Sequence, residues 1–168
     1  GLPMFSTLFG QYSLRPFARR SPRNSRRKSL RQFERLENRS LLATFSVNSI
    51  LDTVDANPGD GLAQDAAGLT TLRAAVMEGN ALAGDDMINL GPNIYALTLA
   101  GANEDDGRTG DLDIRSNGQL IITGVGAGAT SIDAGDLADR VLHVHMDANV
   151  HIEAITFRNG DAFGLPNG

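Results

Sequence analysis

Apolar and polar residues alternate in the same way along two stretches of this chain. The first stretch runs from Leu112 to Ile122 and the second from Leu142 to Ile152, so that matching positions lie 30 residues apart. Alternation with a period of two is typical of a strand that buries one face. Its repetition at a fixed interval of a few tens of residues predicts a stack of β-coils, a solenoid.

Further short strands are predicted on either side of this register. The one nearest the N-terminus is expected at Thr44–Asp55. From residue 86 onward, strands separated by residues rich in Gly, Asn and Asp are predicted at Met87–Leu90, Ile94–Leu99, Leu112–Ile114, Gln119–Thr123, Ser131–Asp133, Val141–Met146 and Val150–Phe157. Such strands without intervening helices fit either a β-sandwich or a solenoid. The 30-residue register favours the solenoid.

One helix is predicted ahead of these strands. Thr70 or Thr71 can cap its start through a hydroxyl group, and Asn80 or Gly84 would end it. The apolar or small residues at helical spacing between them are Leu72, Ala75, Val76 and Gly79. A single helix cannot be a repeat unit. We therefore expect it to cover the open first coil, whose apolar interior would otherwise meet water.

Composition and charge divide the chain into two parts. With 168 residues it is long enough for one domain, and the absence of Cys excludes disulfides and thiolate metal sites. Residues 1–44 carry ten of the 15 Lys and Arg residues, whereas residues 45–168 carry 18 of the 20 acidic residues and no Lys. An acidic body is a poor partner for nucleic acid, which requires cations against its phosphates.

The basic N-terminal segment is expected to be solvated, because the run from Arg19 to Lys28 offers little apolar area to bury. A patch that binds nucleic acid or an anionic membrane would need interleaved aromatic residues or a long amphipathic helix. A secretory signal would need a longer apolar run than Leu41-Leu42-Ala43, and no stretch is long enough to span a membrane. A short helix from Leu30 to Leu42 is a further interpretation of the end of this segment.

The residues Phe33–Ala43, which follow the Arg-rich run, resemble the LEPR-XLL motif found at the N-terminus of many large exported bacterial proteins. The matching residues are Leu36, Glu37, Arg39, Leu41 and Leu42. Asn38 stands where the motif has Pro. The resemblance implies export of the protein to the cell surface or the extracellular space.

The segment Thr70–Val76, with Asn80 and the stretch Asp86–Leu90 after it, resembles the CSLREA domain. Leu72, Arg73, Ala75 and Asn80 match, whereas Thr70 replaces the Cys of that signature and Ala74 replaces its Glu. The resemblance implies a helix that caps a right-handed parallel β-helix of the pectin-lyase-like type. Within it we expect Leu72, Arg73 and Asn80 to be structural residues of the cap, with Arg73 anchoring the helix to the first coil.

Five carboxylates surround two glycines between Asn103 and Asp113. Oxygen ligands on a flexible loop suit Ca²⁺, and the candidate ligands are Asp105, Asp106, Asp111 and Asp113. Their spacing differs from the twelve-residue helix–loop–helix calcium pattern. The alternatives are thus a weak calcium site and a solvated loop between coils that binds no cofactor.

The three histidines of the chain, His143, His145 and His151, are expected to point outward, because they alternate with the apolar positions of their strands. The 30-residue register places His143 beside Asp113 and His145 beside Arg115. Two imidazoles at positions i and i+2 can share a metal ion. Polar surface is the simpler interpretation.

No complete set of catalytic residues is found in the sequence. A glycosidase needs two carboxylates at a defined separation, and the acid pairs Asp85-Asp86 and Asp105-Asp106 fall in loops early in the stack. A Ser-His-Asp set, a phosphate-binding loop and a His-Glu-x-x-His helix are all missing from the sequence. A non-enzymatic protein is therefore favoured, although fold alone does not decide activity.

The combined prediction is a mainly β protein, a right-handed parallel β-helix with one capping α-helix. Residues 1–43 would form a basic, largely disordered leader, and residues 44–168 the cap and first coils of a longer protein. Its function would be that of an exported structural or adhesive scaffold that contacts glycans or other surface proteins, with no nucleic-acid partner and no transmembrane segment. The alternative is the N-terminal part of a polysaccharide lyase or hydrolase.

Overall fold

The computed structural model describes residues 42–101, 104–115, 118–135 and 137–161. These residues belong to one compact unit, Asn38–Gly168. They form nine strands and one helix, so that the described part of the protein is mainly β. In chain order the elements are β1 (Ala43–Ser46), α1 (Leu72–Ala81), β2 (Asp86–Asn89), β3 (Ile94–Ala96), β4 (Leu112–Ile114), β5 (Gln119–Thr123), β6 (Ser131–Asp133), β7 (Leu142–Val144), β8 (Asn149–Glu153) and β9 (Thr156–Arg158).

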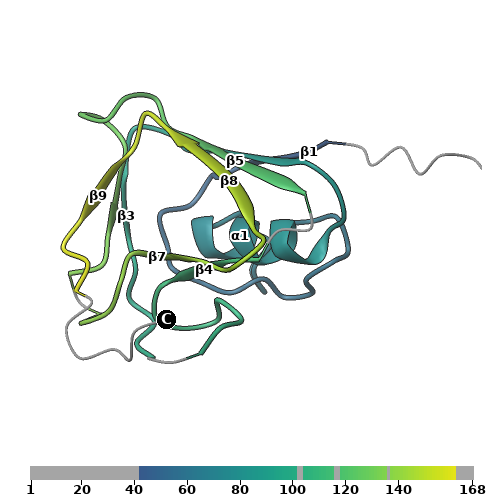
Figure 1. Ribbon diagram of the computed structural model, residues 1–168, viewed down its shortest axis with the longest axis horizontal. Helices are drawn as coiled ribbons and strands as arrows, with labels where there is room; N and C mark the ends of the chain where they lie inside the picture. The colour runs from purple at the N-terminus through teal and green to yellow at the C-terminus, as the bar shows by residue number, and fades with distance from the viewer. Residues whose placement is uncertain (1–41, 102–103, 116–117, 136, 162–168) are drawn as a thin grey trace, which may run out of the picture. The chain divides into compact units, whose positions relative to one another are not determined.

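The strands form three parallel sheets that the chain visits in turn. The first sheet has the order β1-β2-β5-β8, the second β3-β6-β9, and the third pairs β4 with β7. From β2 onward the chain therefore passes through the first, second and third sheets and then begins again, one strand further along each sheet (Figure 1). Every pairing between the described strands is parallel, which is compatible with a β-helix.

The 30-residue register is confirmed at two places, from β4 of the first pass to β7 of the second and from β5 of the second pass to β8 of the third. Leu112 pairs with Leu142 in the third sheet, and Leu120 pairs with Val150 in the first. In the second sheet the interval between paired residues differs from 30: Ser131 pairs with Ile94 on one side and with Thr156 on the other. The turns between strands differ in length from pass to pass, and the strands keep their partners nonetheless.

The predicted alternation places the core correctly in the middle of the stack. The apolar residues on the inward-facing side of β4 and β5 are fully buried: Leu112, Ile114, Leu120 and Ile122. Their partners in β7 and β8 are less covered, and Val144 is 42% exposed. β5 lies between β2 and β8, and β4 contacts both α1 and β7, whereas among the described residues no strand pairs with the far side of β7, β8 or β9.

Four predicted strands are longer than the observed ones; of the predictions Ile94–Leu99 and Val141–Met146, the structure keeps only Ile94–Ala96 (β3) and Leu142–Val144 (β7). The predicted strand Thr44–Asp55 is confined to β1, which starts one residue earlier at Ala43. The predicted strand Val150–Phe157 is divided into β8 and β9, because Ala154 has a left-handed backbone with φ of 59° and turns the chain toward the second sheet. Alternation alone does not reveal this corner, since Ala seldom adopts such a conformation.

The helix α1 covers the first pass of the stack. It contacts β2 and β4, while β1 extends the first sheet by one strand on the same side (Figure 1). Thr71 caps its start: the side-chain oxygen accepts a hydrogen bond from the backbone N–H of Ala74 at 3.1 Å. Eight of its residues are buried, from Leu72 to Gly79. Because Arg73 and Glu78 are among them, their charged groups must find partners inside the fold.

Candidate functional site

The acidic loop between β3 and β4 separates its carboxylates into different partnerships. Asp106 pairs with Arg115 at 2.9 Å, and Asp111 pairs with Arg140 of the following pass at 2.8 Å. The structure therefore does not gather the four acids that the sequence suggested as calcium ligands. Asp105 and Asp113 lie together, whereas Asp106 and Asp111 are each held by an arginine.

One carboxylate oxygen of Asp113 is hydrogen-bonded to two imidazole rings. Nδ1 of His143 lies 3.1 Å from its Oδ1, and Nε2 of His145 lies 2.9 Å from the same atom. The Asp113 side chain is fully buried, and the rings are 25% and 20% exposed. The prediction that His143 sits beside Asp113 is confirmed by the pairing of these two residues in the third sheet.

The ring of His145 does not follow the register. Its backbone N–H still donates to the carbonyl of Ile114 at 3.0 Å, which continues the ladder one residue beyond β7. The side chain contacts Asp113 instead of Arg115, because Arg115 extends toward Asp105 and Asp106. As a result the two histidine rings lie with their centroids 4.0 Å apart.

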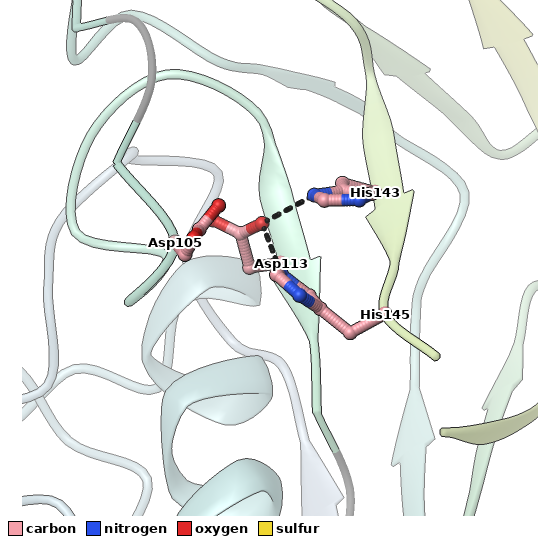
Figure 2. A group of neighbouring side chains, drawn as sticks. All are labelled: Asp105, Asp113, His143 and His145. Atoms are coloured by element: carbon pink, nitrogen blue, oxygen red, sulfur yellow. Dashed lines mark hydrogen bonds and ion pairs between the residues drawn. The ribbon is translucent and has the colours of Figure 1, made fainter. Parts of the chain in front are cut away.

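Asp105 completes a cluster of four side chains that could hold a metal ion. One ligand atom from each of Asp105, Asp113, His143 and His145 lies within 4.8 Å of the other three. Figure 2 shows the two carboxylates beside β4 and the two imidazoles reaching across from β7. Asp105 is the exposed member of the group, with 58% of its side chain accessible.

Arg73 fixes the loop that carries Asp105. Its guanidinium donates to the backbone carbonyls of Gly107, Gly110 and Asp111 at 2.9, 2.8 and 3.3 Å. The loop turns sharply here, with positive φ at Gly107 and Gly110. The carboxylate of Asp52 balances the charge, since its Oδ1 lies 2.5 Å from Nε of Arg73.

Asn80 joins the end of α1 to the end of β4. Its Nδ2 donates to the carbonyl of Asp113 at 2.7 Å, and its Oδ1 accepts from the N–H of Arg115 at 2.8 Å. Leu72, the third residue expected in the cap, is 2% exposed and lies in the core. Two of the cap residues, Arg73 and Asn80, thus contact the first pass through hydrogen bonds, and Leu72 does so by packing.

Burial perturbs a carboxyl group next to the cluster. It raises the pKa of Asp111, and the negative charge of Asp113 raises it further. The guanidinium of Arg140 acts in the opposite direction. Removing a carboxylate from water is costly unless a cation compensates for it, and here one arginine serves a crowded group of acids.

The remaining candidates lie apart from the cluster. His151 is 56% exposed on β8 and 3.5 Å from Glu153, so the prediction that it points outward is confirmed. Asp86 is 1% exposed, and therefore faces the interior rather than a substrate groove. Of the residues expected to form the export motif, Leu36, Glu37, Arg39 and Leu41 lie outside the described residues, and Leu42 is exposed.

Sequence reasoning named all four members of the cluster as candidate metal ligands, but assigned the two acids and the two histidines to separate sites. His143 and Asp113 follow from the register, and the i, i+2 spacing marks His145 as a companion of His143. Nothing in the sequence assigns Asp105 to the same place as the histidines, because its position depends on the fold of the loop. The sequence does not identify Asp52 as the partner of Arg73 either, because a long loop separates the two residues.

Comparison with known protein families, curated proteins and solved structures finds no match to this chain. The described residues contain no helix with the length and apolar character needed to cross a membrane.

Proposed function

We propose that this protein is an exported structural or adhesive scaffold built on a right-handed parallel β-helix, of which the described residues are the cap and first coils. The observation that carries the proposal is the repeated passage of the chain through three parallel sheets in a constant order. Each added pass extends all three sheets by one strand, and this is how a β-solenoid grows into a long, rigid surface.

The helix α1, which covers the first pass, also supports this interpretation. A first coil without cover would expose an apolar interior and unpaired strand edges to water. Here α1 buries most of its surface against that coil, and Arg73 and Asn80 bond to its backbone. The stack therefore has a built beginning, as a repeat array requires at its terminus.

The outward positions favour a binding surface over an active site. Strand residues that face away from the core include Gln119, Ile121 and Thr123 on β5 and Asn149, His151 and Glu153 on β8. This mixture of amide, hydroxyl, imidazole and carboxylate groups suits hydrogen bonding to neutral glycans or to other proteins. Residues 45–168 carry many more acids than arginines, which disfavours nucleic acid as a partner.

Export is proposed from the motif at Phe33–Ala43 and its Arg-rich approach. The test is to locate the tagged full-length protein in its native bacterial host by cell fractionation and by protease treatment of the cell surface. We expect surface or extracellular protein for the unchanged chain, and retention inside the cell when Arg39, Leu41 and Leu42 are all replaced by Ala. A matched control replaces Leu30 with Ala, which lies outside the motif residues and should leave export intact.

Retention of the unchanged protein in the cytoplasm would contradict the export proposal. Equal export of the triple variant would contradict the role of the motif. Neither result bears on the β-helix part of the proposal, which depends on strand pairing and not on export.

A calcium role for the acidic loop receives less support than the scaffold. Asp106 and Asp111 pair closely with arginines, Asp105 lies 3.7 Å from Arg115, and Asp113 is bonded to two imidazoles. Ca²⁺ prefers six to eight oxygen ligands. We propose that any Ca²⁺ binding by the loop is weak and uses exposed oxygens.

A further inference from the structure

We propose that Asp113, His143 and His145, with Asp105 as fourth ligand, form a binding site for a divalent transition metal of the zinc class. The site would join the acidic loop and β4 of one pass to β7 of the next. It is independent of the scaffold function, since it depends only on the local arrangement of these four side chains.

The distances in the cluster are close to those of a tetrahedral site. Zinc binds imidazole nitrogen and carboxylate oxygen at about 2.0–2.2 Å, so that ligand atoms at the corners of a tetrahedron lie about 3.3 Å apart. Oδ1 of Asp113 lies 3.1 Å from Nδ1 of His143 and 2.9 Å from Nε2 of His145. The fourth ligand atom, from Asp105, lies within 4.8 Å of each of the others. A side-chain rotation of this exposed residue can close the remaining gap.

The chemistry of the ligands selects the class of metal. Two imidazoles and two carboxylates are a donor set that suits zinc, and also copper, nickel and cobalt. Magnesium and calcium prefer sets made of oxygen alone. Because half of the cluster consists of nitrogen ligands, a transition metal fits it better than calcium does.

Charge also favours a cation at this point. Asp113 is fully buried, and its carboxylate faces two rings that are neutral unless they are protonated. The one arginine that reaches Asp105 lies 3.7 Å away and pairs more closely with Asp106, at 2.9 Å. A dication would compensate for Asp105 and Asp113 together, which no described cation does at short range.

The ligands are held in place by groups behind them. Oδ2 of Asp113 accepts the N–H of Gly107 at 3.2 Å, which leaves Oδ1 directed at the histidines. The side-chain amide of Asn80 donates a hydrogen bond to the backbone carbonyl of Asp113. Arg73 holds the loop through the carbonyls of Gly107 and Gly110. Such supporting contacts orient ligands and contribute to metal affinity.

A hydrogen-bonded group without metal is the competing explanation, in which an N–H of each ring donates a hydrogen bond to Oδ1 of Asp113. The two explanations differ in whether metal alone binds to the folded protein. The probe is therefore ZnCl₂ added to chelator-treated full-length protein in a calorimeter, with CoCl₂ as a second probe whose visible spectrum reports tetrahedral nitrogen and oxygen coordination.

We expect one equivalent of Zn²⁺ to bind, a higher melting temperature with the metal, and an intense tetrahedral Co²⁺ spectrum. The double variant His143→Gln/His145→Gln should weaken binding by about tenfold or more and abolish the thermal shift. The matched control is His151→Gln, which removes an exposed histidine from the neighbouring sheet and should bind as the unchanged protein does.

A second pair of variants separates a ligand from its neighbour in the loop. Asp105→Asn should weaken Zn²⁺ binding, whereas Asp106→Asn, whose carboxylate pairs with Arg115, should leave it nearly unchanged. Circular dichroism of each variant verifies that the fold is retained. Absence of a Zn²⁺ equivalent, equal binding by the double histidine variant, or displacement of Zn²⁺ by a modest excess of Ca²⁺ would each overturn the proposal.

Discussion

Arg73 on the capping helix and Asp52 on the loop before it form a buried ion pair. Nε of Arg73 lies 2.5 Å from Oδ1 of Asp52, and the two side chains are 0% and 2% exposed. Asp52 also accepts the backbone N–H groups of Thr98 and Leu99 at 2.6 and 2.9 Å. The pair therefore connects three segments: the helix, the loop before it and the chain that follows β3.

Replacing Arg73 with Ala should destabilise the protein severely. It leaves the Asp52 carboxylate buried without its cation and frees the three loop carbonyls, a change that typically costs about 3–5 kcal/mol. Urea denaturation followed by circular dichroism measures the loss. Arg115→Ala is the control, because Arg115 is 41% exposed and surface pairs contribute about 0–1 kcal/mol. Equal losses for the two variants would refute an anchoring role for Arg73.

The two adjacent threonines before α1 should respond differently to substitution. The side chain of Thr71 caps the helix and donates to the carbonyl of Thr53 at 2.7 Å, whereas Thr70 precedes the cap. Thr71→Ala should lower the free energy of unfolding by about 0.5–2 kcal/mol, and Thr70→Ala by clearly less. The midpoint of urea unfolding gives both values, and a larger effect at Thr70 would show that the cap is misassigned.

Asn80→Ala should weaken the junction between α1 and β4. It removes a donor to the carbonyl of Asp113 and an acceptor for the N–H of Arg115, at an expected cost of about 1–3 kcal/mol. Asn149→Ala on the exposed side of β8 is the comparison and should cost much less. Thermal unfolding of both variants decides the matter, and the prediction fails if their melting temperatures agree.

Asp86 should make stability depend on pH in an unusual direction. Burial raises the pKa of its carboxyl, the hydrogen bond from Ala43 opposes this, and the charges of Asp85 and Glu78 add to it. One of its oxygens, Oδ2, is buried without a hydrogen-bond partner. A carboxyl with a raised pKa in the folded state stabilises the fold below its unfolded pKa of about 3.9, and this stability is lost as pH rises through the folded value.

The variant Asp86→Asn cannot ionise and should escape that loss. Relative to the unchanged protein, its free energy of unfolding should increase as pH rises from about 3.9 toward neutrality. Urea denaturation across this range measures the difference. Asp85→Asn, at the exposed neighbouring position, is the control and should show a smaller trend. A difference for Asp86→Asn that stays constant with pH would contradict the assigned cause.

The parts of the fold that follow from local pattern were predictable from the sequence. Period-two alternation locates β4, β5 and β6 at their observed bounds, and helical spacing after Thr71 locates α1. The 30-residue interval correctly pairs His143 with Asp113. These features depend on neighbours in sequence or on a repeat that the sequence itself displays.

The features that were missed depend on chain direction or on contacts between loops. The alternation of apolar and polar residues does not reveal the corner at Ala154, so the sequence predicts one strand where the structure has β8 and β9. Asp105 approaches the histidines through the fold of its loop, to which Arg73 donates a hydrogen bond at Gly107. Neither an isolated positive φ at an alanine nor a carbonyl-binding arginine has a signature in composition or spacing.

The proposed scaffold depends most on the parallel register between successive passes, and the absence of Cys from the chain allows a direct test. Thr123 on β5 pairs with Glu153 on β8, and the side-chain oxygens of the two lie 3.3 Å apart outside the core. Neighbouring strands are about 4.8 Å apart, within the range that a disulfide spans. The measurement is disulfide formation under mild oxidation in the double variant Thr123→Cys/Glu153→Cys, compared with Thr123→Cys/His151→Cys.

We predict rapid and nearly complete formation of an intramolecular disulfide in the first variant. The second should form little, because its cysteines are two residues out of register and more than about 7 Å apart. Equal crosslinking of the two variants, or preference for the second, would contradict the in-register parallel stack.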